Sequence, residues 1–152
     1  MRHIETSVEI ARPPVAVWRV LTDFPSYPAW NPFIRRIEGD ARVGARLRVT
    51  VQPPGRKPMT FQPTVRAAEP ARELRWLGRV LIPGLFDGEH AFVIEPVGGG
   101  CLLRHEERFT GLLAGAFPGM LADTAKGFEA HNAALKRQVE SAARGPTAGT
   151  PG

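Results

Sequence analysis

The chain has 152 residues, of which 43% are hydrophobic and 23% are charged, and its formal net charge is +5. This length predicts one domain with a core of its own, and the composition is ordinary for a globular protein. The single cysteine, Cys101, excludes an internal disulfide and any metal site that needs several cysteines. No stretch approaches the roughly 20 apolar residues of a membrane span, and the N-terminus lacks the apolar run of a signal peptide, so we expect a cytoplasmic protein.

The arginines of this basic chain do not gather into a patch. Arg46 and Arg48 alternate with Leu47 and Val49, as on the solvated face of a half-buried strand. A groove that binds nucleic acid needs clustered positive charge. We therefore expect no nucleic-acid partner.

The first part of the chain indicates one strand and two helical segments. Residues 3–10 alternate weakly between apolar and polar and predict a strand. Pro13–Pro14 suits the first turn of a helix, because proline lacks the N–H group that would be unpaired there. Apolar residues at helical spacing continue from Val17 to Phe24. The proline-rich residues 27–32 predict a turn or a second short helix.

The middle of the chain is typical of antiparallel strands joined by turns. Apolar and polar residues alternate most clearly at Ala45–Gln52, as expected for a strand with one buried face. Turn residues interrupt the pattern at Gly39–Asp40 and at Pro53–Pro58. The predicted strands cover residues 33–38, 45–52, 59–69, 73–81, 85–94 and 102–111. Connections of hairpin length favour an antiparallel meander.

A long helix follows the strands. Its apolar stripe repeats at steps of three and four residues and consists of Leu121, Ala125, Phe128, Asn132, Leu135 and Val139. Lys126 and His131 fall off this stripe, so we expect both to be solvated. We assign residues 1–144 to a single domain and residues 145–152, rich in glycine and proline, to a disordered tail. The apolar stripe of the helix and the apolar face of the sheet can bury each other in a two-layer α+β fold.

Three acid–base groups lie on the apolar face of the last two predicted strands. The even positions of 85–94 are mostly apolar but include His90, and the odd positions of 102–111 are mostly apolar but include His105 and Glu107. The opposite face of the second strand is expected to be solvated and carries Arg104, Glu106 and Arg108. Burying an unpaired polar group costs about 2–7 kcal/mol. The pattern therefore predicts either paired groups in the core or a pocket that holds water.

The glycine-rich turn Val97–Gly100 fixes how these two strands pair. A turn centred on its glycines places His90 opposite Glu107 and Phe92 opposite His105. A register shift of one residue would turn every side chain to the other face, so only shifts of two residues are allowed. Side chains directly opposite each other have Cβ atoms about 4.5–5.5 Å apart, so a His–Glu hydrogen bond is within reach.

Three roles remain open for these groups. A structural His–carboxylate pair would offset the free-energy cost of its own burial and hold the hairpin in register. A polar anchor in an apolar cavity fits the usual composition of a small-molecule pocket. In general acid–base catalysis, the carboxylate would hold the imidazole in one tautomer, while His90 or His105 transfers the proton. The residue types also suit zinc, but nothing beyond a shared face supports a metal, so we expect no metal and no cofactor.

The order of elements and several motifs resemble the SRPBCC superfamily, which includes START, Bet v 1-like and polyketide cyclase/dehydrase-like proteins. The resemblance covers roughly residues 3–140, and within the superfamily the chain is most similar to the small bacterial branch. It depends most on Val17–Phe24, Tyr27–Phe33, Leu74–Trp76, Gly88–Phe92 and Glu107–Gly111. It implies a helix-grip fold, in which a curved antiparallel sheet of about six to seven strands wraps around the long C-terminal helix and an apolar cavity. Two short helices follow the first strand in that fold.

A superfamily does not fix a function, and the resemblance leaves three. The first is a carrier or sensor that encloses a small or medium hydrophobic molecule between sheet and helix. The second is an enzyme of the cyclase/aromatase or hydrolase kind, with His90, His105 and Glu107 as catalytic candidates in the same cavity. The third is a protein-interaction domain similar to Hsp90-activator domains, with a vestigial cavity. We favour the first, because the sequence shows no nucleophile with a positioned base.

The expected ligand-binding residues come from both layers of the fold. They are Trp76, Phe86, His90, Phe92, His105, Glu107, Phe109, Met120, Phe128 and Asn132. Two connections of apolar composition, residues 81–87 and 112–119, either gate the cavity, pack on each other, or contact a partner or a membrane.

Overall fold

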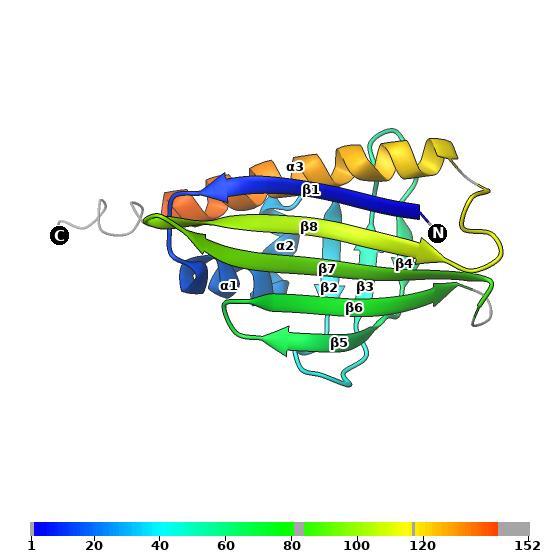
Figure 1. The fold of residues 1–152 in the computed structure, drawn as a ribbon, viewed down its shortest axis with the longest axis horizontal. Coiled ribbons are helices and arrows are strands. Elements are labelled where there is room, and N and C mark those ends of the chain that lie inside the picture. The colour runs from blue at the N-terminus through cyan, green and yellow to red at the C-terminus, as the bar shows by residue number, and fades with distance from the viewer. Residues whose placement is uncertain (1, 81–83, 117, 143–152) are drawn as a thin grey trace.

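A curved antiparallel sheet lies against the long C-terminal helix in the computed structural model of the protein (Figure 1). The structure describes residues 2–80, 84–116 and 118–142. The strands are β1 (Arg2–Ile10), β2 (Ile34–Glu38), β3 (Arg48–Val51), β4 (Met59–Phe61), β5 (Thr64–Glu69), β6 (Glu73–Val80), β7 (Phe86–Val97) and β8 (Gly100–Thr110). The helical segments are α1 (Pro14–Thr22), the 3₁₀ turn η1 (Phe24–Ser26), α2 (Tyr27–Trp30) and α3 (Pro118–Ala142). The predicted α+β helix-grip architecture is confirmed.

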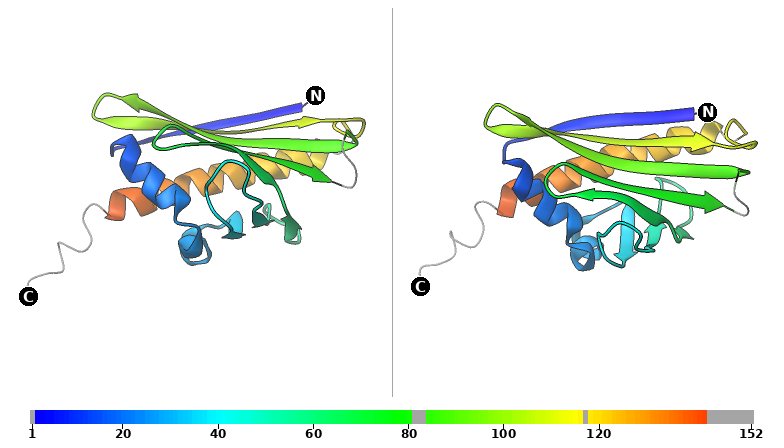
Figure 2. Two further views of the ribbon diagram at one scale, coloured as in Figure 1. Left: turned by 90° about the horizontal axis from the view of Figure 1, so that it is seen from below. Right: turned by 60° about the horizontal axis from the view of Figure 1, so that its bottom comes forward.

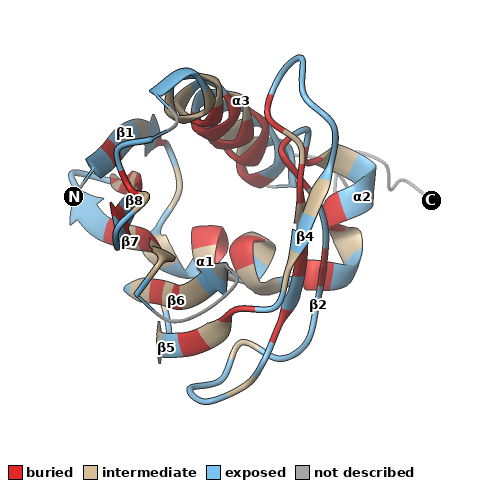
Figure 3. Ribbon diagram, turned by 90° about the vertical axis from the view of Figure 1, so that its right-hand side faces the viewer, coloured by how far each residue is buried: buried red, intermediate tan, exposed pale blue. Residues whose placement is uncertain are grey.

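The strands form two sheets rather than one continuous sheet. The larger sheet has the order β1-β8-β7-β6-β5, and the smaller sheet has the order β2-β3-β4. An isolated bridge between Arg46 and Thr64 connects them. Figure 2 shows α3 running beneath the larger sheet, and the end view of Figure 3 shows the smaller sheet on the other side of the domain. The two sheets and α3 therefore surround a common interior.

The predicted strand over residues 59–69 is wrong in one respect, because the structure divides it at Gln62–Pro63. β4 pairs with β3 in the smaller sheet, whereas β5 pairs with β6 at the edge of the larger sheet. Proline has no N–H group for a strand ladder and favours strand ends and bulges. The Pro63 carbonyl accepts a hydrogen bond from the Leu47 N–H at 2.8 Å, which holds this corner in place.

The β7–β8 hairpin has the register that its glycine turn predicts. His90 lies opposite Glu107, and Phe92 lies opposite His105. On the other side of β7, Trp76 of β6 lies opposite His90. The inner face of the larger sheet therefore carries Trp76, His90 and Glu107 side by side on three adjacent strands.

The outer face of β8 differs from its prediction at one position. Arg108 is exposed and Arg104 is half-buried, but Glu106 is buried, with 8% of its surface exposed. β8 is a central strand, so Glu106 has Glu5 of β1 on one side and Ala91 of β7 on the other. Neighbouring strands on both sides leave such a residue less open to solvent than alternation alone implies.

The short helical segments after β1 pack into one unit. α1 begins at Pro14, as its prolines predict. Tyr27 is fully buried, and its hydroxyl donates a hydrogen bond to the Leu21 carbonyl at 2.5 Å. Burial raises the pKa of Tyr27 above its usual value. Trp30 packs on Tyr27 within α2, with ring centroids 5.1 Å apart, and the hydrogen bond of the Tyr27 hydroxyl connects α2 to α1.

α3 buries a wider surface than its predicted stripe. The predicted positions that are fully or almost fully buried are Phe128, Asn132, Leu135 and Val139. His131 is also completely buried, so the expectation that it is solvated is wrong. The reason is that α3 packs on β1 and β8 along one side and on α1 and α2 along another. Lys126 is exposed, as predicted.

The core contains fully buried side chains from the larger sheet and from α3, among them Phe92, Leu103 and Leu135. Among the described residues, no helix is both long enough and apolar enough to cross a membrane. The predicted tail, residues 145–152, lies outside the described residues.

Candidate functional site

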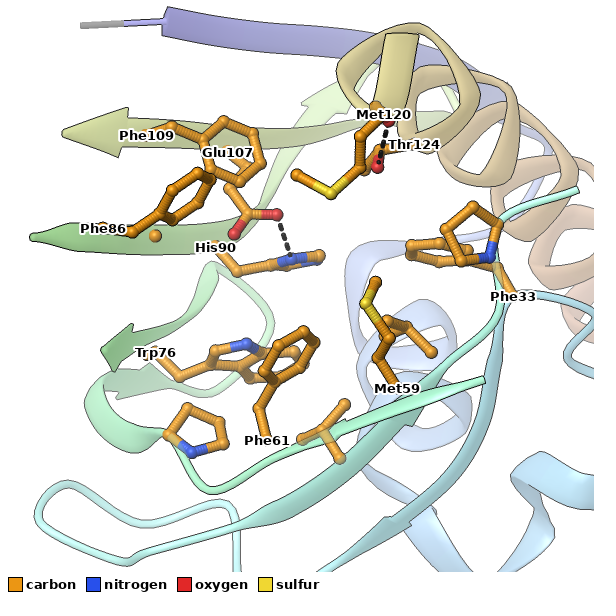
Figure 4. A pocket seen from close by; sticks show the side chains of 16 residues that line it. Phe33, Met59, Phe61, Trp76, Phe86, His90, Glu107, Phe109, Met120 and Thr124 are labelled. Carbon is orange, nitrogen blue, oxygen red and sulfur yellow. Dashed lines mark hydrogen bonds and ion pairs between the residues drawn. The ribbon is translucent and has the colours of Figure 1, made fainter. Parts of the chain in front are cut away.

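A cavity of about 270 Å³ lies between the two sheets, beside the first turns of α3 (Figure 4). Side chains of the larger sheet, the smaller sheet and α3 form its walls. They are Phe33, Val49, Val51, Pro53, Met59, Phe61, Pro63, Trp76, Gly78, Phe86, Gly88, His90, Glu107, Phe109, Met120 and Thr124. No lysine or arginine is among these residues, so the side chains of the wall are apolar apart from one imidazole, one indole N–H, one carboxyl group and one hydroxyl group.

Six of the ten expected ligand-binding residues line this cavity. They are Trp76, Phe86, His90, Glu107, Phe109 and Met120. The other four, Phe92, His105, Phe128 and Asn132, are buried behind the wall and do not line the cavity. These four form the layer that supports His90 from the core side.

The remaining lining residues lie outside the expected set, and several come from the smaller sheet. Val49 and Val51 belong to β3, and Met59 and Phe61 belong to β4. The alternation at residues 45–52 identifies the inward positions of β3. It does not reveal that the smaller sheet faces β6 and β7 across a cavity, since that depends on the corner at Pro63.

A continuous chain of polar groups starts at the cavity wall. Nδ1 of His90 lies 3.3 Å from Oε1 of Glu107, the pair that the hairpin register predicts. Nε2 of His90 lies 2.7 Å from Nε2 of His105. Nδ1 of His105 lies 2.9 Å from Oδ1 of Asn132, whose Nδ2 donates to Oγ1 of Thr6 at 2.8 Å. The chain therefore connects the cavity to α3 and β1.

The cavity wall holds His90 in one orientation. Its ring stacks on Trp76 with centroids 4.8 Å apart and an interplanar angle of 19°, while both of its nitrogens have hydrogen-bond partners. His90 is 5% exposed, whereas 17% of the Glu107 side chain is exposed. Glu107 is therefore the more open of the two groups.

His105 belongs to the core rather than to the cavity. Its ring stacks on Phe128 with centroids 3.8 Å apart and lies 4.4 Å from the Phe92 ring. Burial lowers the pKa of His105 well below its usual value, and the neighbouring His90 and His131 lower it further. Hydrogen bonds to the side chain and backbone of α3 oppose this shift without reversing it. His105 is therefore neutral near pH 7.

The fourth histidine of the chain, His131, is connected through Asn31 to the wall residue Phe33. Oδ1 of Asn31 accepts hydrogen bonds from the N–H groups of Phe33 at 3.0 Å and Ile34 at 2.8 Å, so its Nδ2 donates to Nδ1 of His131 at 2.8 Å. His131 then carries its proton on Nε2, for which the described residues offer no acceptor. Burial, with a smaller contribution from His90, lowers the pKa of His131 to about 3.

Two glycines open the wall beside His90. Gly78 of β6 pairs directly with Gly88 of β7, and both line the cavity. A Cβ atom at Gly88 would lie 2.5 Å from Oε2 of Glu107, whereas one at Gly78 would meet nothing closer than 3.7 Å. The missing side chain at Gly88 therefore leaves the space that the Glu107 carboxyl group occupies.

Within their described residues, the two apolar connections, 81–87 and 112–119, reach the cavity wall at one point. Phe86, in the 81–87 connection, lines the cavity. At α3, Nε of Arg56 lies 2.6 Å from Oδ2 of Asp123, so this ion pair connects the loop between β3 and β4 to the helix. The N–H groups of Leu112 and Leu113 donate to the Gly84 and Leu85 carbonyls at 3.1 and 2.9 Å, so the described parts of the two connections contact each other. Residues 81–83 and 117 lie outside the described residues, so a gate and a contact with a partner or a membrane stay predictions.

The described residues include one group with the spacing of a metal site, and it lies away from the cavity. The candidate ligand atoms of His3, Glu5 and Glu106 lie within 4.8 Å of one another. In the polar chain, the Nε2 atoms of His90 and His105 are 2.7 Å apart. Two nitrogens of one tetrahedral zinc site lie about 3.3 Å apart, given Zn–N distances of about 2.0–2.1 Å, so this contact is a hydrogen bond and not a zinc ligand pair.

Comparison with known proteins identifies relatives of this architecture. The family model described as polyketide cyclase / dehydrase and lipid transport matches residues 1–140. The Zhui aromatase/cyclase from a Streptomyces species is similar in structure, with 22% identity, a TM-score of 0.73 and 99% of each chain covered. A START superfamily protein from Mycobacterium smegmatis has 24% identity and a TM-score of 0.70, over 92% of this chain and 98% of that chain. No curated protein matches the chain.

A protein from Thermus thermophilus is also similar, with 19% identity and a TM-score of 0.72, over 93% of this chain and 99% of that chain. At these identities the solved structures share the fold, and the family model covers almost the whole chain. Both agree with the fold described above. The chain belongs to the polyketide cyclase/dehydrase and lipid transport family, within the SRPBCC superfamily.

Proposed function

We propose that the protein binds one small apolar molecule in the cavity, and that Glu107 and His90 hold a polar group of that molecule. The observation that carries the proposal is a cavity of about 270 Å³ whose apolar wall contains one hydrogen-bonded acid–base pair. Ligand pockets commonly combine an apolar wall with a few placed polar groups. Protein cores are otherwise packed with few voids larger than a water molecule, so a space of this size is typical of a ligand-binding site.

The volume limits the ligand. Small-molecule pockets usually measure about 300–1,000 Å³, so a cavity of about 270 Å³ lies at the small end of this range. This space suits a compact molecule of one or two fused rings better than a long-chain lipid. Phe61, Trp76 and Phe109 offer aromatic surface to such rings.

The similar structures support a ligand of this class. One is named as an aromatase/cyclase, one as a START superfamily protein, and the family description includes lipid transport. The open cavity gives no support to the alternative of an interaction domain, in which the cavity would be a remnant.

Binding is tested with 2-naphthol, a neutral bicyclic probe, by calorimetry. Gly78→Leu places a side chain in the cavity where nothing lies closer than 3.7 Å to the new Cβ atom, so we expect affinity to fall at least tenfold. Gly99→Leu is the matched control, because a Cβ atom there meets nothing within 4 Å and Gly99 does not line the cavity. Equal binding by both variants, or no binding by the unmodified protein, would contradict the proposal.

A second candidate function is an enzyme that uses the same pair. It is favoured by the placement of His90, which is held between Glu107 and a neutral His105 on the wall of a substrate-sized cavity. Such a pair can exchange a proton with a bound molecule. A bell-shaped pH–rate profile that His90→Gln abolishes would support catalysis, whereas a rate unaffected by His90→Gln would exclude this role.

A further inference from the structure

The geometry points to a ligand preference: the cavity selects neutral apolar molecules that carry a hydroxyl group, and Oε2 of Glu107 accepts the hydrogen bond of that hydroxyl. This inference rests on the proposed binding function. It follows from the directions of the hydrogen bonds in the polar chain, which fix where each proton lies.

The directions are set at the end of the chain that lies away from the cavity. The Thr6 hydroxyl has one hydrogen and donates it to the His105 carbonyl at 3.0 Å. Thr6 Oγ1 must therefore accept from Nδ2 of Asn132, which lies 2.8 Å away. This orientation turns Oδ1 of Asn132 toward Nδ1 of His105, so Nδ1 carries a hydrogen.

The hydrogen-bond directions are fixed in turn up to the cavity wall. A neutral His105 with a hydrogen on Nδ1 has only a lone pair on Nε2, so Nε2 of His90 must donate across the 2.7 Å contact. A neutral His90 with that hydrogen would turn a lone pair toward Oε1 of Glu107, 3.3 Å away. Two lone pairs repel each other, so one further proton lies between His90 and Glu107.

The pair of His90 and Glu107 is therefore neutral as a unit, whichever atom carries the shared proton. The charged or titratable groups that face His90 are Glu107 of β8, His105 of β8 and, in the electrostatic environment of both rings, His131 of α3. Burial keeps both of these histidines neutral. No lysine or arginine lines the cavity, so nothing there would compensate an anionic ligand.

The second carboxyl oxygen of Glu107 is the acceptor that remains. Its Oε1 faces His90, whereas Oε2 has no hydrogen-bond partner among the described residues and lies over the gap left by Gly88. Figure 4 shows the carboxyl group inside the cavity, between Phe109 and His90. The hydroxyl of Thr124 is already engaged, since it donates to the Met120 carbonyl at 2.8 Å.

These conditions distinguish between ligand classes. A carboxylate or phosphate would bring lone pairs and a negative charge toward Oε2 without a cation to balance them. An ammonium would lose its hydration for a carboxyl group that His90 already neutralises. A hydroxyl group supplies one hydrogen without adding charge, so it is the polar group that this wall accommodates best.

The test compares three probes of nearly equal shape, naphthalene, 2-naphthol and 2-naphthoate, by calorimetry at pH 7. We expect the unmodified protein to bind 2-naphthol about tenfold more tightly than naphthalene, and 2-naphthoate more weakly than naphthalene. In Glu107→Leu the advantage of 2-naphthol over naphthalene should disappear while naphthalene still binds. The control is Glu106→Gln, which removes a carboxylate on the opposite face of the same strand and should keep the tenfold preference.

The outcomes separate this inference from the proposed function. If naphthalene and 2-naphthol bind equally to the unmodified protein, or if 2-naphthoate binds most tightly, the hydroxyl preference is wrong, but the binding of an apolar molecule in the cavity stands. If none of the three probes binds, both are wrong. The comparison in the unmodified protein decides the matter even if Glu107→Leu does not fold.

Discussion

Alanine substitutions at Gly78 and Gly88 test whether the Glu107 carboxyl group depends on the hollow in the wall. The two glycines pair directly on neighbouring strands, and both line the cavity. The new Cβ atom at position 88 would lie 2.5 Å from Oε2 of Glu107, so the carboxyl group at the end of this flexible side chain must shift. At position 78 the nearest atom would be 3.7 Å away, an ordinary contact.

The expected magnitudes follow from these contacts. Replacing glycine by alanine where the backbone allows it stabilises a protein by about 0.4–1 kcal/mol, because the unfolded chain loses freedom. We expect this gain for Gly78→Ala. Gly88→Ala should show the same gain but lose the hydrogen bond between Glu107 and His90, and bonds of this kind contribute about 1.5–3 kcal/mol. The free energies of unfolding of the two variants should therefore differ by about 2 kcal/mol, with Gly88→Ala the less stable.

Urea denaturation followed by tryptophan fluorescence measures this difference, since Trp76 stacks on His90 beside both glycines. Equal m-values would show that the unfolded states are comparable. If the two variants have the same free energy of unfolding, the carboxyl group does not need the space at Gly88 and the described geometry of the pair is wrong.

Three further predictions concern the layer behind the cavity. Asn31→Ala should lower the free energy of unfolding by about 2–4 kcal/mol, because it leaves two buried N–H groups and His131 without partners; a loss below about 0.5 kcal/mol in urea denaturation would contradict the role of Asn31. Stability should fall as the pH drops below about 6.5, because the unfolded chain binds protons that buried His131, with its pKa of about 3, does not bind. Each such histidine contributes up to about 1.4 kcal/mol per pH unit, so His131→Gln should make the decline between pH 6.5 and pH 5 less steep, and an unchanged slope would refute this explanation. Gly127→Ala should destabilise the protein by about 1–3 kcal/mol, although alanine is the better helix former, because a Cβ atom there would overlap the Phe33 ring. Adding Phe33→Leu should recover part of that loss, and strictly additive effects would show that the two positions do not clash.

Local signals in the chain predict the hairpin and its polar pair correctly. Glycines fix the turn at Val97–Gly100, and a period of two then determines that His90 faces Glu107. Alternation defines the face of a residue but not its depth. His90 lines the cavity and His105 does not, because the Phe128 ring of α3 stacks on His105 and covers it.

The errors have related physical causes. The periodicity of α3 predicts one apolar stripe, but the helix is covered on a second side by α1 and α2, which buries His131. The strand predicted over residues 59–69 changes sheets at Pro63. Both outcomes depend on contacts between segments far apart in the chain, and no local pattern reports those contacts.

A crystal structure of the protein with 2-naphthol tests the central claim most directly. The account predicts that the rings occupy the space between Trp76, Phe109 and Met120, with the hydroxyl oxygen about 2.5–3.0 Å from Oε2 of Glu107. Side chains of the wall filling that space, or the probe bound elsewhere on the protein, would contradict it.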